Sequence, residues 1–337
     1  MDLTIIWIAL TIVCWVLFFV LEGFDFGVGM LSPLLGRDEH QRSAAIRTIG
    51  PLWDGNEVWL VAAIGVTFAA FPDWYAALLS GLYLPIVLVL LALAARGVAI
   101  EFRIKNESAS WRRRADVALA ASSAVAALGF GAVIGVMVGG LAINDGGEVM
   151  AGANALTRTI APLMTPGAII GALASLVSSL ALGATFLALR TTGPVRERAT
   201  KLAAPLLAVL AVAALAAAIA LMVAGLVLQA ALLAVVALLL AAGWGIVRRG
   251  REALGFTLAS AATALTVVTA LTAQLPVVLP STLNDAFSIT MQSAAASDYA
   301  LQVISIGALC ILPGVLLYQG WSYWVFRKRV ASERVAS

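Results

Sequence analysis

Long apolar runs dominate this sequence and constrain its fold more than any other feature. Stretches such as 202–223 and 226–247 consist mainly of Ala, Leu, Val and Ile. A helix needs about 20 consecutive apolar residues to cross the hydrocarbon core of a bilayer, whereas a surface helix of a soluble protein keeps one polar face. The composition agrees, because 62% of the residues are hydrophobic, 12% are charged and the mean hydropathy is +1.01. The sequence therefore predicts an all-α integral membrane protein.

The apolar runs predict about nine membrane-spanning helices. They form a single polytopic membrane domain over residues 1–337, because no connecting segment is long enough for a soluble domain. The sixth and seventh spans are the hardest to separate, since only Gly225 and Gln229 interrupt the apolar stretch that contains them. The predicted spans are 4–31, 52–71, 76–96, 115–138, 165–189, 202–223, 226–247, 252–275 and 299–326.

Basic residues fall almost entirely on one side of this predicted topology. When alternate loops are assigned to opposite sides, all of the 21 Lys and Arg residues except Arg158 lie on the same side. Short loops rich in Lys and Arg face the cytoplasm, so we expect the N-terminus outside and the C-terminus in the cytoplasm. The net charge of +3 is spread over short clusters between apolar runs, which indicates a lipid bilayer rather than a nucleic acid as the surroundings.

Two cytoplasmic loops resemble each other and suggest an internal repeat. The first span leads into "LGRDEHQRSAAIRTIGP", and the fifth leads into "LRTTGPVRERATKLAAP". This echo predicts a parallel repeat of two four-helix bundles related by an axis along the membrane normal. Helices 1–4 would lie in about 4–138, helices 5–8 in about 165–275, and the ninth helix, at about 299–326, would be peripheral.

Carboxylates inside or at the edge of the first two spans are the most informative polar residues. "FFVLEGFDFGVGM" places Glu22 and Asp25 on one helix face, and "GPLWDGNEVWLV" repeats the spacing with Asp54 and Glu57. Because the two spans run in opposite directions from one loop, both pairs are predicted to lie in one layer near the cytoplasmic surface. Acids at this depth usually face a protein interior or a water-filled path, where they exchange protons or form pairs. We therefore predict a proton path through these acids.

A structural role is the alternative for the same acids, in which nearby arginines pair with them and tie helix ends together. At the inner end of the third span, "RGVAIEFR" places Arg96 and Glu101 close together in sequence, and this pair is predicted to be a structural ion pair. Gly23 and Gly27 of the first span have the small-xxx-small spacing that allows close helix packing.

The single histidine of the chain, His40, lies in the first cytoplasmic loop. The chain therefore cannot supply a pair of histidine ligands to a haem, copper or non-haem iron within the membrane, and no metal site is expected. From its residues, the chain is either a proton-handling subunit of a larger complex, a proton-coupled secondary transporter, or a scaffold subunit.

Several motifs resemble subunit II of the cytochrome bd-type quinol oxidases. They extend in order along the chain, although the Ala-rich middle does not contribute. The motifs are "EGFDFGVGML", "LGR", "GPLWDGNEVWLVAAIGVTFAAFPDWYA", "RGVAIEFR", "LPVVLPSTLNDAFSITMQSAAASDYAL" and "YQGWSYWVFRKR".

The resemblance implies a heterodimer in the bacterial plasma membrane. A partner subunit I would carry haems b and d, oxidise quinol and reduce dioxygen to water, as an electrogenic, proton-translocating oxidase. This chain would share its nine-helix fold and line a proton path through Asp25 and Asp54, with Glu22 and Glu57 flanking them. Some family members hold a quinone in subunit II, but no residue here assigns such a site. Small accessory subunits are left open.

Overall fold

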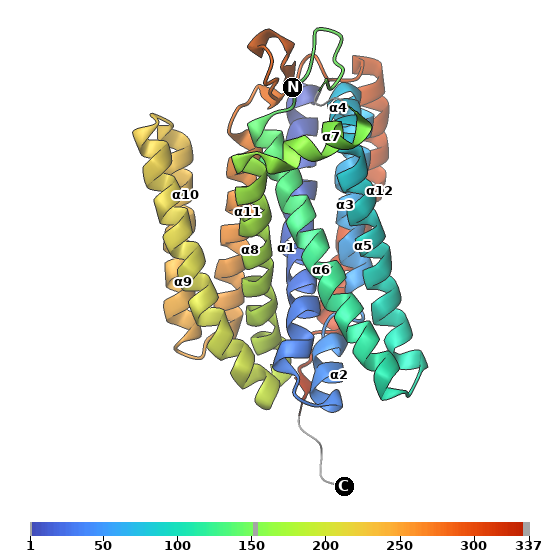
Figure 1. Cartoon of the computed structure of the whole chain (residues 1–337), viewed down its shortest axis with the longest axis vertical. Helices are drawn as coiled ribbons and strands as arrows, with labels where there is room; N and C mark the ends of the chain where they lie inside the picture. Colours follow the sequence, from blue (N-terminus) through green and yellow to red (C-terminus); the bar gives the residue numbers. More distant parts are fainter. Residues whose placement is uncertain (1, 151–153, 333–337) are drawn as a thin grey trace.

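The computed structural model describes residues 2–150 and 154–332. Long helices run up and down between two ends of an elongated bundle (Figure 1). The longer helices are α1 (Leu3–Leu35), α3 (Trp53–Ala70), α5 (Tyr83–Phe102), α6 (Ala109–Gly139), α8 (Pro166–Arg190), α9 (Pro194–Val223), α10 (Val227–Val247), α11 (Glu252–Thr272) and α12 (Asp298–Val325).

Short elements connect these helices at both ends of the bundle. Two small two-stranded sheets occur, in which β1 pairs with β4 in parallel and β2 pairs with β3 in antiparallel. The short elements are α2 (Glu39–Arg47), α4 (Pro72–Gly81), η1 (Arg103–Lys105), α7 (Ala155–Ile160), η2 (Ala161–Met164), β1 (Thr191–Thr192), β2 (Val277–Leu279), η3 (Asp285–Phe287), β3 (Ile289–Thr290) and β4 (Val330–Ala331).

Within the described residues, eight helices are long and apolar enough to cross a membrane, which confirms the all-α membrane class. Each predicted span overlaps one long helix of the structure. The remaining long helix, α3, has 18 residues and begins with the polar Asp54, Asn56 and Glu57, which lower its mean hydropathy. A membrane crossing by α3, and with it the count of about nine, stays a prediction.

The predicted third span, 76–96, is wrong in its first part. The structure divides this region at Leu82, between α4 and α5. Pro85 has no backbone N–H to donate to the carbonyl four residues earlier, so a helical hydrogen bond is lost at the point where the structure divides the two helices. The spanning helix therefore begins at Tyr83 and continues past the predicted end to Phe102.

Glycines bring α1 and α8 into backbone contact. A Cβ added at Gly27 would lie 1.9 Å from the carbonyl oxygen of Ser179 and 2.7 Å from the Cα of Gly183. A Cβ at Gly23 would lie 3.0 Å from the side chain of Leu182. The expected close helix packing at Gly23 and Gly27 is therefore confirmed, and α8 is the partner helix.

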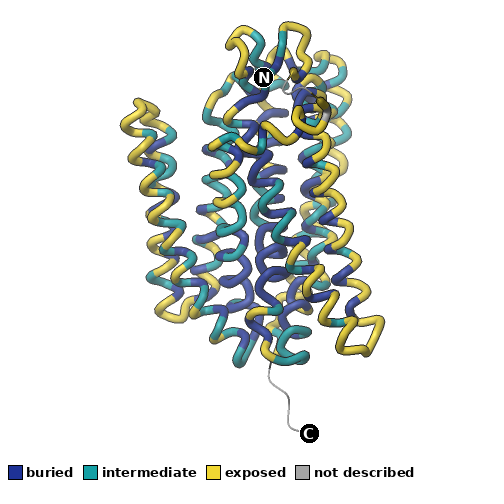
Figure 2. The backbone as a smooth tube through the Cα atoms, in the orientation of Figure 1, coloured by how far each residue is buried: buried dark blue, intermediate teal, exposed yellow. Residues whose placement is uncertain are grey.

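Helix α1 lies at the centre and packs against α3, α6, α8 and α11. Helices α8, α9, α10 and α11 form a second group of neighbours, and α9 and α10 lie along the edge of the bundle, with exposed residues along their whole length (Figure 2). In α12, Leu301 is the one described residue that is buried, and the main contacts of this helix with other long helices are to α1 and α3. The peripheral position predicted for the last helix agrees with these contacts, whereas the parallel repeat stays a prediction.

Candidate functional site

The first-span acids meet an arginine inside the bundle. Glu22 and Asp25 of α1 and Arg96 of α5 are all fully buried. The Arg96 guanidinium donates a short hydrogen bond to Oε1 of Glu22 through Nη1, and its Nη2 lies 3.5 Å from Oε2 of the same carboxylate. Its Nη2 also lies 3.9 Å from Oδ2 of Asp25. Two acids one helical turn apart thus share one cation.

Glu57 of α3 is the third carboxylate around Arg96. Its Oε2 lies 3.6 Å from Nη1 of Arg96, and its side chain is 27% exposed. The guanidinium also lies near two aromatic rings, with its Cζ 5.0 Å from the ring centroid of Phe26 and 6.0 Å from that of Trp53. These contacts hold the cation in place by cation–π attraction as well as by charge pairing.

Asn56 joins this cluster to the last helix. Its Nδ2 donates to Oδ2 of Asp25 at 2.7 Å. Its Oδ1 accepts from Nε2 of Gln319 at 3.0 Å and from the Tyr323 hydroxyl at 2.7 Å. We name Glu22, Asp25, Asn56, Glu57, Arg96, Gln319 and Tyr323 the acid cluster.

The acid cluster has more acidic than basic groups. Among the residues that the structure describes, Arg96 is the one cation that pairs with the carboxyls of Glu22, Asp25 and Glu57. Within the described part of the chain, Oδ1 of Asp25, Oε2 of Glu57 and Nε of Arg96 have no hydrogen-bond partner. One cation cannot neutralise three carboxylates, two of them fully buried, so the charge balance favours bound protons in the cluster. Such a group of acids can accept and release protons.

Comparison with known proteins identifies the family. The model for cytochrome bd terminal oxidase subunit II matches residues 3–326. The chain belongs to this family. It is 38% identical over 334 residues to cytochrome bd ubiquinol oxidase subunit 2 of Bacillus subtilis (strain 168), covering 97% of this chain and 96% of that one. It is 31% identical over 368 residues to cytochrome bd-I ubiquinol oxidase subunit 2 of Escherichia coli (strain K12), covering 99% and 96%.

The fold is also that of a solved bd oxidase. A chain of the bd oxidase from Geobacillus thermodenitrificans matches with a TM-score of 0.77 and 18% identity, covering 97% of this chain and 100% of that chain. The family resemblance and the multi-pass location in the bacterial plasma membrane are thereby confirmed. This subunit II is part of an oxidoreductase complex, which replaces the transporter hypothesis.

Asp54 does not join the acid cluster, in contrast to the predicted layer of acids. It is exposed, whereas Asn56 takes the buried position. The buried stripe of α3 follows Asn56, Leu60, Ala63 and Thr67, and Asp54 lies two residues before it. Two residues correspond to about 200° around a helix, so Asp54 points away from the side on which Asn56 is buried.

The predicted ion pair between Arg96 and Glu101 is wrong. Arg96 pairs with Glu22 on another helix, and Glu101 is exposed. Residues five apart lie about 140° apart around a helix, so the two side chains cannot meet.

Sequence reasoning missed Asn56, Gln319 and Tyr323. Asn56 lies between two acids in "WDGNE". A prediction based on carboxylates alone does not include its amide side chain. Gln319 and Tyr323 are four residues apart in an apolar helix, and hence on one face. A polar pair on one face of an apolar helix indicates a hydrogen bond to a polar group of another helix.

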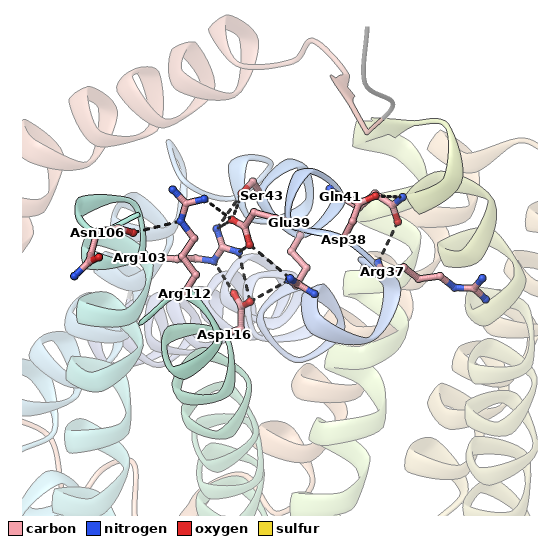
Figure 3. A network of polar contacts seen from close by, with 10 residues as sticks. Arg37, Asp38, Glu39, Gln41, Ser43, Arg103, Asn106, Arg112 and Asp116 are labelled. Carbon is pink, nitrogen blue, oxygen red and sulfur yellow. Dashed lines mark hydrogen bonds and ion pairs between the residues drawn. The ribbon is translucent and has the colours of Figure 1, made fainter. Parts of the chain in front are cut away.

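A second network lies at the end of the bundle where α1 leads into α2 (Figure 3). Arg103 donates from Nε to Oδ1 of Asp116 at 2.6 Å and from Nη1 to Oγ of Ser43 at 2.9 Å. Its guanidinium also pairs with Glu39 at 3.0 Å, and Arg112 lies 3.4 Å from the same carboxylate. Partial burial would raise the pKa of Glu39, but Arg103, Ser43 and Arg112 outweigh it and hold that pKa below its ordinary value. This network joins α2, η1 and α6.

The spanning helices of this chain offer no histidine, the commonest axial ligand of haem iron. Its single histidine, His40, lies in α2, beyond the end of α1. In the described ranges, no group of three or more His, Cys, Asp and Glu residues is placed to hold a metal ion. The acid cluster itself contains no nitrogen or sulfur ligand of the kind that binds haem iron.

Proposed function

We propose that this chain is the haem-free subunit II of a quinol oxidase that couples quinol oxidation to the reduction of dioxygen to water. Its relatives in Bacillus subtilis and Escherichia coli are named as subunits of ubiquinol oxidases. Haems b and d would be held by the partner subunit I, where they supply the electron transfer and oxygen chemistry. The single histidine, outside the spanning helices, supports this division.

The role of this chain is to take up protons from the cytoplasm. The acid cluster carries this proposal, because burial increases from Asp54, which lies outside the cluster, to the carboxyls within it. Asp54 is exposed, Glu57 is 27% exposed, and Asp25 and Glu22 are fully buried. Such a gradient leads from water to the interior, and buried acids with few cations retain exchangeable protons. Protons would enter near Asp54, pass Glu57 and reach Asp25 and Glu22.

Subunit I would cover the side of this chain where the acid cluster comes closest to the surface. That side is formed by α3, which carries Glu57, and by the thinly packed α12, which carries Gln319 and Tyr323. A proton path that ends at a haem of the partner must be continuous across the interface. Packing of the partner against α3 and α12 satisfies this condition, and it would make the path electrogenic because protons enter from one side only.

Replacement of Asp25 tests the proposal. Asp25→Asn keeps the size of the side chain but removes its exchangeable proton, so oxygen consumption with quinol should fall by about 100-fold or more. Haem content and assembly with subunit I should be unchanged. Asp54→Asn should slow turnover less, since water can replace an exposed carboxylate. Glu101→Gln, at an exposed acid outside the acid cluster, is the matched control.

Two outcomes would contradict this function. Normal turnover in Asp25→Asn would exclude a relay through this residue. Loss of the assembled, haem-bearing complex in Asp25→Asn, with no loss in Glu101→Gln, would support the scaffold role of the acids instead.

A further inference from the structure

A polar pocket outside the acid cluster lies at the Arg-rich end of α9. It has a volume of about 600 Å³ and opens between the first turns of α9 and the connection from α10 to α11. Its lining includes Lys201, Arg196 and Arg248, together with Glu197 and Glu252. In Figure 1, this region is at the lower end of the edge formed by α9 and α10.

The two acids of this pocket do not cancel its positive charge. Glu252 is already paired, with Nη2 of Arg196 at 2.5 Å and Nη2 of Arg329 at 3.6 Å. Lys201 and Arg248 are exposed, and neither forms an ion pair with any described residue. Their N–H donors therefore remain available to an anion. Glu197 is the one acid in the pocket lining that forms no ion pair with a described residue.

Two helix N-termini add to this positive field. Helix α9 begins after Gly193, and α11 begins after Arg251. Neither N-cap residue caps its helix with its own side chain, although the Val195 N–H of α9 donates to Oγ of Ser332, and Glu197 and Glu252 lie in the two first turns. The N-terminal ends of both helices carry partial positive charge, which favours an anion between them.

The surroundings of the pocket are those of a membrane interface. The Arg248 guanidinium lies over the ring of Trp244, with its Cζ 5.1 Å from the ring centroid, and tryptophans of this kind mark the headgroup level. Further along α9 from Lys201, the exposed face is apolar and includes Val209, Val212 and Ile219. A molecule with an anionic head and apolar tails would match both surfaces.

We propose that this pocket binds the phosphate group of an anionic phospholipid, with Lys201 and Arg248 as its donors and the acyl chains along α9. Basic pockets between spanning helices at the cytoplasmic side are suited to such headgroups. The ion pairs of Glu252 with Arg196 and Arg329 hold the start of α11 against α9 and so shape the pocket. Free phosphate shares the headgroup chemistry, but it would not use the apolar face of α9.

Native mass spectrometry of the assembled, delipidated complex tests this proposal. Phosphatidylglycerol, phosphatidylcholine and inorganic phosphate are titrated separately onto the wild-type complex, onto the double variant Lys201→Gln/Arg248→Gln, and onto the control Arg113→Gln/Arg114→Gln. The control removes two exposed arginines from the start of α6, on the same Arg-rich side. We expect the pocket variant to bind phosphatidylglycerol about 30-fold more weakly, from the usual contribution of two basic residues at an anionic surface. The control should bind it as wild type does.

Each remaining outcome decides the matter. Equal losses in both double variants would indicate diffuse surface attraction and overturn the site, as would unchanged binding in the pocket variant. Binding of phosphatidylcholine as tight as that of phosphatidylglycerol would overturn the role of the anionic charge. Inorganic phosphate that binds as tightly as phosphatidylglycerol would assign the pocket to a soluble anion and overturn the lipid. If the double variant does not assemble, Lys201→Arg/Arg248→Lys should retain binding, and its failure to bind would overturn the proposal.

Discussion

Replacement of Arg96 by glutamine is the sharpest test of the acid cluster. Arg96 and Glu22 are both fully buried and joined by two hydrogen bonds, and Asp25 and Glu57 also depend on the same guanidinium. The variant Arg96→Gln removes the cation that these acids share. The acids then remain inside the bundle without a compensating charge.

The expected cost follows from this burial. Removal of one partner from a buried ion pair destabilises a protein by about 3–5 kcal/mol, because the other charge is left without compensation. No discount for solvent screening applies, since neither side chain is exposed. The double variant Arg96→Gln/Glu22→Gln removes both members of the closest pair. It should therefore be less destabilised than Arg96→Gln, although Asp25 and Glu57 still lose their cation.

Thermal denaturation of the assembled complex in mild detergent measures these effects. Arg96→Gln should lower the denaturation midpoint strongly, the double variant should recover part of the loss, and Arg113→Gln, at an exposed arginine, should change little. A midpoint for Arg96→Gln equal to that of wild type would refute the reasoning. A double variant less stable than the single one would show that the side chains stabilise the fold independently rather than as a pair.

Three further predictions follow from contacts elsewhere. Gly27→Ala should destabilise the complex by about 1–3 kcal/mol or more, because the new Cβ would lie 1.9 Å from a carbonyl oxygen of α8. As a control, Gly65→Ala should leave the denaturation midpoint unchanged, because a Cβ at Gly65 would have no neighbouring atom within 4 Å. The lowered pKa of Glu39 means that its stabilising contribution is complete above its ordinary pKa and is lost as the pH falls through the lower folded-state value. Glu39→Gln should thus lower the midpoint at neutral pH and reduce its further fall on acidification, and parallel curves for variant and wild type would contradict this. Tyr323→Phe removes one of the two donors to Oδ1 of Asn56 and should cost about 1 kcal/mol, whereas an unchanged midpoint would show that the bond contributes nothing.

The membrane helices could be predicted from the sequence because apolar length is a local property. Each predicted span overlaps a long helix, and the close approach at Gly27 followed from spacing alone. The break at Leu82 was not predicted, because apolar residues continue on both sides of it. Pro85 was the sequence feature that could have indicated it. Hydropathy describes the preference of a segment for an apolar environment and carries no information about a lost backbone hydrogen bond.

Partners across helices were harder to predict than helices. The acids Glu22 and Asp25 were correctly expected to share a face, since three-residue spacing fixes this. The sequence does not specify the rotation of α3 about its axis, so Asp54 was predicted in a position that Asn56 occupies. Arg96 was paired with a neighbour in sequence, whereas its true partner lies on α1. Contacts of this kind depend on how complete helices pack against each other.

The attachment of α12 connects the acid cluster to the assembly of the complex. This helix buries only Leu301 among its described residues, yet Gln319 and Tyr323 both donate to Asn56, which in turn donates to Asp25. A helix with so little apolar burial within its own chain takes much of its stability from whatever covers its outer face. If subunit I covers that face, as we propose, then docking of the partner holds Gln319 and Tyr323 in place and so orients Asn56 on Asp25. The geometry of the proton-carrying acid would then depend on assembly, and proton uptake would be established only where a haem-bearing partner can use it.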